Sequence, residues 1–126
     1  MILKGGYGLL YSLVFGLVTL GYGIIPKIVR PKEINSWYGY RTDFSTKNQD
    51  VWDEGNRYSS NQYIIAGIIL LVIGRISYAV IGNKGFWAPL IAFVPVLMCT
   101  VFTTEKHLKS MFDDDGVLIK KTKDKK

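Results

Sequence analysis

Three long apolar runs constrain the fold of this chain more than any other feature of its 126 residues. They cover residues 5–25, 63–81 and 86–102, with Arg75 as the one formal charge inside them. A helix needs about 20 apolar residues to cross a hydrocarbon core of about 30 Å, so the first two runs are long enough and the third is marginal. Because lipid cannot satisfy free backbone groups, each run should be helical. The sequence predicts an all-α membrane protein with three transmembrane helices.

Two other interpretations of the apolar runs are weaker. The first run exceeds the usual apolar core of a signal peptide and ends at Pro26 without an Ala-x-Ala-like cleavage site. A soluble helical hairpin would need a polar face, which these runs lack. We therefore predict a single membrane domain over residues 1–126, with a structured loop at residues 26–62 and a tail at residues 103–126.

The distribution of lysine and arginine predicts the orientation. Three spans place Lys4 and Lys84 on one side of the membrane and 13 basic residues of the loop and tail on the other. Short basic segments resist translocation, so the loop and tail should be cytoplasmic and the N-terminus outside. The net charge of +6 is spread along the chain, and the final lysines are typical of a segment that meets anionic lipids. Membrane lipids are thus expected partners, and nucleic acid is not.

Small residues recur every four positions in the first run, at Gly8, Ser12 and Gly16. This spacing lets another helix backbone approach closely, which is how helices associate in lipid. The partner is either the second helix, with Gly67 and Gly74, or another copy of the chain in a homo-oligomer. The residues alone leave both open, although packing within one chain is favoured.

Charged and reactive side chains within the runs are few. Arg75 could face the bundle as a functional group or extend its guanidinium to the headgroups, and both remain open. Cys99 has no second cysteine to pair with, and His107 is the single histidine. No catalytic triad or metal-ligand spacing occurs around them. We expect no enzyme activity, no cofactor and no metal.

The loop carries the most distinctive residues. The pattern of the segment from Thr46 to Tyr58 predicts a short helix lying on the membrane, with Ser45 as its N-cap. Aromatic rings here suit the headgroup level, but a simple anchor does not need so many polar residues. The candidate binding residues are Asn35, Trp37, Gly39, Tyr40, Arg41, Thr42, Ser45, Asn48, Trp52, Gly55 and Asn56.

The order and spacing of these residues resemble the signature of the SdpI family of bacterial membrane proteins. The match consists of Asn35-Ser-Trp37-Tyr-Gly39-Tyr40-Arg41-Thr42, then Ser45 and Asn48, then Trp52 and Gly55-Asn56-Arg57. The family is named for immunity to a peptide toxin, and its signature precedes two further spans, as here. The resemblance implies a short, single-module member in the bacterial cytoplasmic membrane.

Within the signature, Arg41 offers a planar guanidinium that Trp52 could stack on and that Asp50 or Asp53 could hold. Such a loop either braces itself or binds a ligand, and the residues do not separate the two. The resemblance implies a non-catalytic membrane protein that confers immunity to a membrane-active peptide toxin. The alternatives are a signalling scaffold that recruits a cytoplasmic regulator and a small transporter subunit.

Overall fold

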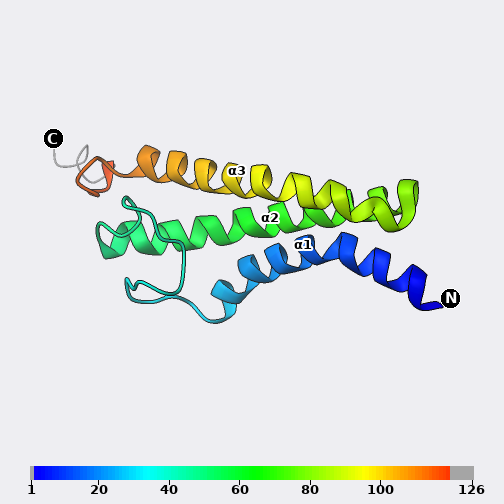
Figure 1. Ribbon diagram of the computed structural model, residues 1–126. Helices are drawn as coiled ribbons and strands as arrows, with labels where there is room; N and C mark the ends of the chain where they lie inside the picture. The colour runs from blue at the N-terminus through cyan, green and yellow to red at the C-terminus, as the bar shows by residue number, and fades with distance from the viewer. Residues whose placement is uncertain (1, 120–126) are drawn as a thin grey trace.

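The protein is a bundle of long helices in a computed structural model that describes residues 2–119. The elements are α1 (Ile2–Ile28), α2 (Gln49–Ile81), the short 3-10 helix η1 (Gly82–Phe86) and α3 (Trp87–Met111). Figure 1 shows α2 lying between α1 and α3, with all three helices running side by side. No strand forms among the described residues, where one isolated bridge joins Phe112 to Leu118. The all-α prediction is confirmed.

The surface of the bundle is apolar. Large side chains such as Val80, Ile91 and Phe102 are 75%, 71% and 69% exposed. Two helical stretches, Tyr7–Ile28 and Gln49–Met111, are long and apolar enough to cross a membrane, and the second contains the whole α2–η1–α3 hairpin. A continuous apolar exterior of this kind is expected where lipid is the solvent. The protein is therefore placed in a membrane.

Glycines bring α1 and α2 into close contact. A Cβ added to Gly16 would lie 2.6 Å from the backbone nitrogen of Leu71, and one on Gly67 would lie 2.6 Å from that of Leu20. A Cβ added to Gly74 would come closer still to the carbonyl oxygen of Ser12. The stripe thus packs within the same chain, with Ser12 and Gly16 against α2 and Gly8 against Asn83 of η1, as small residues at such spacings permit.

The helices extend beyond the predicted spans at one end of the bundle. Helix α2 begins at Gln49, where the Asn48 side chain accepts a hydrogen bond from the Val51 nitrogen at 3.0 Å. Ser45 is therefore not the N-cap, and residues 49–58 of the predicted separate helix are instead the first part of α2. The loop covers only residues 29–48, which is less than the predicted 26–62. The Asn48 cap stabilises the start of α2 at Gln49, so the polar residues before position 63 belong to the same helix as the second apolar run.

A small core lies at this extended end. Tyr40 and Phe44 from the loop, Val51 from α2, and Leu108 and Phe112 at the end of α3 are each at most 8% exposed. Figure 1 shows the loop, the start of α2 and the end of α3 gathered at the end opposite the N-terminus and η1. The structure thus builds a compact end, centred on the loop, outside the apolar runs.

Candidate functional site

Two residues of α2 hold the loop from beneath. Trp52 is fully buried, and its indole nitrogen donates a hydrogen bond to the Pro31 carbonyl at 2.7 Å. One turn later, the Asn56 side-chain oxygen accepts from the Tyr40 backbone nitrogen at 2.7 Å, while its amide donates to the Trp52 carbonyl at 2.8 Å. Residues four apart share a helix face, so one face of α2 fixes both ends of the 31–40 segment.

Gly39 is the position where the loop approaches this face most closely. Its φ of 107° lies in a region that side chains rarely adopt. A Cβ here would also lie 2.7 Å from the Asn56 oxygen and 3.1 Å from the Trp52 ring. Glycine is therefore required by both conformation and space.

Thr42 and Ser45 close a reciprocal turn. The Thr42 nitrogen donates to the Ser45 hydroxyl oxygen at 2.8 Å, and the Ser45 nitrogen donates to the Thr42 hydroxyl oxygen at 3.1 Å. The buried Ser45 hydroxyl donates in turn to the Tyr40 carbonyl at 3.2 Å. Gly55 of α2 packs beneath this turn, where an added Cβ would come within 3.4 Å of Ser45. The turn is thus tied to itself and seated on α2.

Two asparagines order the flanks of the loop. The Asn35 side-chain oxygen accepts from the backbone nitrogens of Trp37 and Tyr38 at 3.0 and 2.6 Å, which makes a local turn. Asn48, besides capping α2, donates through its side-chain amide to the Gly116 carbonyl at 2.8 Å. That bond joins the loop to the turn that follows α3.

Glu105 of α3 anchors the loop from the other side. One of its carboxylate oxygens accepts from the Tyr40 hydroxyl at 2.7 Å and from the Thr42 hydroxyl at 2.6 Å. Burial, and then the bond to Glu105, raise the pKa of Tyr40 far above its ordinary value, so this hydroxyl stays protonated. Glu105 was not among the predicted binding residues. The one sequence feature that could have indicated a role for Glu105 is that it is an acidic residue placed three positions after the third apolar run.

Arg41 is not held in the predicted way. Its side chain is exposed, whereas the Trp52 ring is fully buried under the loop. Asp53 pairs instead with Arg30 at 3.7 Å and accepts from Gln49 at 2.8 Å. Arg41 is therefore exposed, and among the described residues it forms no ion pair with Asp50 or Asp53. Trp37 is also outside, with 80% of its surface exposed.

Beside Arg41 lies a cavity of about 220 Å³, here called the aromatic pocket. It is enclosed by α1, the loop and α2, and is lined by Tyr22, Ile25, Pro26, Trp37, Tyr38, Gly39, Tyr40, Arg41, Asn56, Ser59, Ser60 and Tyr63. Arg41 is the one charged residue in this lining. Five of the predicted signature residues thus meet at one pocket.

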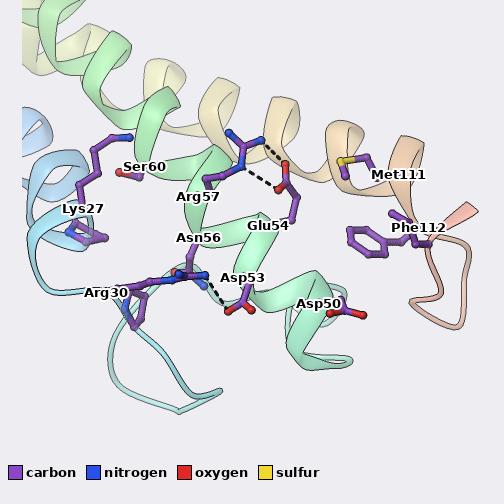
Figure 2. Close-up of a pocket in the computed structure, with 13 residues that line it drawn as sticks. Lys27, Arg30, Asp50, Asp53, Glu54, Asn56, Arg57, Ser60, Met111 and Phe112 are labelled. Atoms are coloured by element: carbon purple, nitrogen blue, oxygen red, sulfur yellow. Dashed lines mark hydrogen bonds and ion pairs between the residues drawn. The ribbon is translucent and has the colours of Figure 1, made fainter. Parts of the chain in front are cut away.

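A larger cavity of about 630 Å³, here called the charged cleft, lies beside the aromatic pocket and shares Pro26, Asn56 and Ser60 with it. Figure 2 shows two ion pairs along its wall, Arg30 with Asp53 and Arg57 with Glu54, while Met111 and Phe112 lie across from them. The Arg57 Nε donates to Glu54 at 2.9 Å. The basic and acidic groups of the charged cleft therefore largely neutralise each other.

Glu54 also links α2 to α3. Its carboxylate lies 2.7 Å from the His107 ring nitrogen, and His107 stacks on Tyr58 with ring centres 3.9 Å apart. The bond from Arg57, followed by that from His107, lowers the pKa of Glu54 against the opposing effect of burial. His107 thus has a packing partner and an acidic partner, neither of which was predicted.

Arg75 lies apart from the loop. Its side chain is exposed on the outside of α2, where it does not point into the contact with α1. Among residues 2–119, no three His, Cys, Asp or Glu side chains gather in a way that could hold a metal. Every fully buried side-chain nitrogen or oxygen in the described part has a hydrogen-bond partner.

Comparison with known proteins relates the chain to one family. A model of the SdpI/YfhL protein family matches residues 32–104, which include most of the loop, all of α2 and much of α3. The uncharacterized protein YfhL of Bacillus subtilis (strain 168) is 38% identical over 105 residues, covering 83% of this chain and 92% of YfhL. Immunity protein SdpI of the same organism is 30% identical over 108 residues, covering 82% of this chain but 47% of SdpI. No solved structure matches significantly.

Proposed function

Since this chain belongs to the SdpI/YfhL family, we propose that it is a non-catalytic membrane protein that protects its membrane against a membrane-active peptide. The proposal is supported chiefly by the fact that some signature residues are buried and hold the loop, while others are exposed. The buried members of the signature, such as Trp52 and Asn56, bond to the backbone of the loop, whereas Trp37 and Arg41 are exposed. A rigid loop that presents an exposed tryptophan and arginine is suited to recognition, because these two residue types dominate binding surfaces.

The signature offers little support for catalysis. The hydroxyls of Thr42 and Ser45 and the amides of Asn35, Asn48 and Asn56 are engaged in turns, a helix cap and backbone contacts. Such groups position a surface and do not activate a nucleophile, which needs an adjacent base. Binding is therefore the favoured role.

The proposal includes three spans, with the loop and C-terminus in the cytoplasm and the N-terminus outside. It is supported by the 13-to-2 distribution of basic residues and by the gathering of the loop and the end of α3 at one end of the bundle (Figure 1). We expect a reporter fused after Lys126 to lie in the cytoplasm and a reporter fused before Met1 to lie outside. Labelling of both ends on the same side would exclude an odd number of spans.

Arg41 gives the test of protection. Because its side chain is exposed, Arg41→Ala should leave the amount of protein in the membrane unchanged. We expect it to remove protection when a susceptible bacterium expressing the protein is challenged with membrane-active peptides, measured as survival. Loss of an arginine at the centre of a binding surface typically lowers affinity by a factor of about ten or more.

Arg30→Ala is the matched control. Arg30 is also exposed and has an ion pair of 3.7 Å to Asp53, but it lines the charged cleft and not the aromatic pocket. Exposed pairs contribute about 0–1 kcal/mol, so this variant should fold and protect normally. Equal survival of the two variants at equal abundance would contradict the proposal.

A further inference from the structure

The aromatic pocket lies at the level where the apolar runs end. Tyr22 and Ile25 belong to the last turn of the first run, and Tyr63 is the first residue of the second. Both Tyr22 and Ile25 are more than half exposed, and the Tyr22 ring packs edge-on against Tyr63 at 5.1 Å. Aromatic side chains at such boundaries sit among lipid headgroups. The mouth of the pocket is therefore next to lipid.

The lining of the pocket has a definite chemistry. Aromatic and aliphatic groups form its walls, and Arg41 is its one charge, with no aspartate or glutamate among the lining residues. A guanidinium matches a phosphate through two parallel hydrogen bonds. A zwitterionic lipid would bring an ammonium group for which the pocket has no carboxylate. The lining thus complements a group with net negative charge.

The size of the pocket limits the occupant further. About 220 Å³ is below the range of about 300–1,000 Å³ that encloses a drug-sized molecule. A phosphate with its glycerol fits this scale, while an acyl chain can leave past Ile25 into the bilayer. The charged cleft, in contrast, is larger and carries both signs of charge. It shows no preference for an anion.

We propose that the aromatic pocket binds the phosphate headgroup of an anionic membrane lipid, with Arg41 as the phosphate ligand and Tyr22 and Tyr63 beside the glycerol and upper acyl chain. This site does not depend on the protective role proposed above. A lipid held here would join α1 to the loop, because the lining takes residues from both.

The test uses the full chain purified in detergent and titrated with dioleoylphosphatidylglycerol or dioleoylphosphatidylcholine. Native mass spectrometry would count the lipid molecules retained. We expect one phosphatidylglycerol to bind about fivefold more tightly than phosphatidylcholine, the preference typical of one basic residue at a membrane surface. Arg41→Gln should abolish this preference, and Arg41→Lys should retain most of it, because lysine still binds phosphate as a point charge.

A second pair of variants tests the location without changing any charge. Ile25→Trp should fill the mouth of the pocket and reduce phosphatidylglycerol binding several-fold, whereas Ile24→Trp, on an exposed neighbour outside the lining, should not. Equal binding by these two variants, or a preference that survives Arg41→Gln, would overturn the inference. Complete displacement of the lipid by excess inorganic phosphate would also overturn it, because the acyl chain would then contribute nothing. Protection against the peptide is measured in a separate survival assay, so the proposed lipid site and the proposed protective role can each be contradicted without the other.

Discussion

Replacing Gly16 with leucine is expected to disrupt the packing of α1 on α2. A Cβ at this position would already lie 2.6 Å from the Leu71 backbone nitrogen and 2.7–2.8 Å from the Leu71 side chain. Overfilling a packed interior costs about 1–3 kcal/mol when side chains can move, and a backbone neighbour has less freedom to do so. We expect a loss at or above the upper end of that range, seen as a lower thermal midpoint in detergent by circular dichroism.

Leu17→Ala is the matched control for Gly16→Leu. Leu17 is the next residue along α1, but 49% of its surface is exposed on the lipid-facing side. Its truncation removes contacts with lipid or detergent and not with α2, so the thermal midpoint should change little. If the two variants melted at the same temperature, the close contact between α1 and α2 would not be a source of stability.

Replacing Trp52 with alanine is expected to release the signature loop. Trp52 is the largest fully buried side chain in the described part, and its indole nitrogen holds the Pro31 carbonyl. Truncating a buried tryptophan costs about 3–5 kcal/mol, and an unpaired buried carbonyl adds to this. The expected result is rapid proteolytic cleavage within residues 29–48 and a lower thermal midpoint, while the membrane helices remain.

Trp37→Ala makes the same chemical change at an exposed site. Because 80% of Trp37 is exposed, the loop should keep its resistance to protease and its thermal midpoint. Protection, in contrast, should fall, since Trp37 belongs to the surface proposed for recognition. Cleavage of the loop at the same rate in both variants would mean that Trp52 does not brace it.

The two tryptophans illustrate why the site could be predicted only in part. Both stand in the signature, and the order of the signature residues identified the family correctly. Nothing in the local sequence says that one ring is buried and the other exposed. That difference arises because α2 begins at Gln49 and carries Trp52 beneath the loop. A separate helix lying on the membrane would have left both rings at the headgroups.

Arg41 and Glu105 show the same limit over a longer distance. Aspartates near Arg41 in the sequence were the expected partners, but Asp53 pairs with Arg30 and the loop is held by Glu105. Glu105 lies 63 residues from Thr42 and 65 from Tyr40 along the chain. Contacts of this kind depend on where α3 ends relative to the loop, which spacing within a motif does not encode.

The helical class, the membrane environment and the family could all be predicted from the sequence. Each follows from local properties, since lipid requires apolar helices and the signature is read in one stretch of chain. The small residues of α1 likewise predicted a close contact, although its partner remained open. The packing of α1 on α2, the bonds from Glu105 to the loop and the exposure of Arg41 became visible in the folded chain. Those outcomes depend on how polar atoms from distant segments satisfy one another, because every buried group needs a partner and several partners are compatible with the same local pattern.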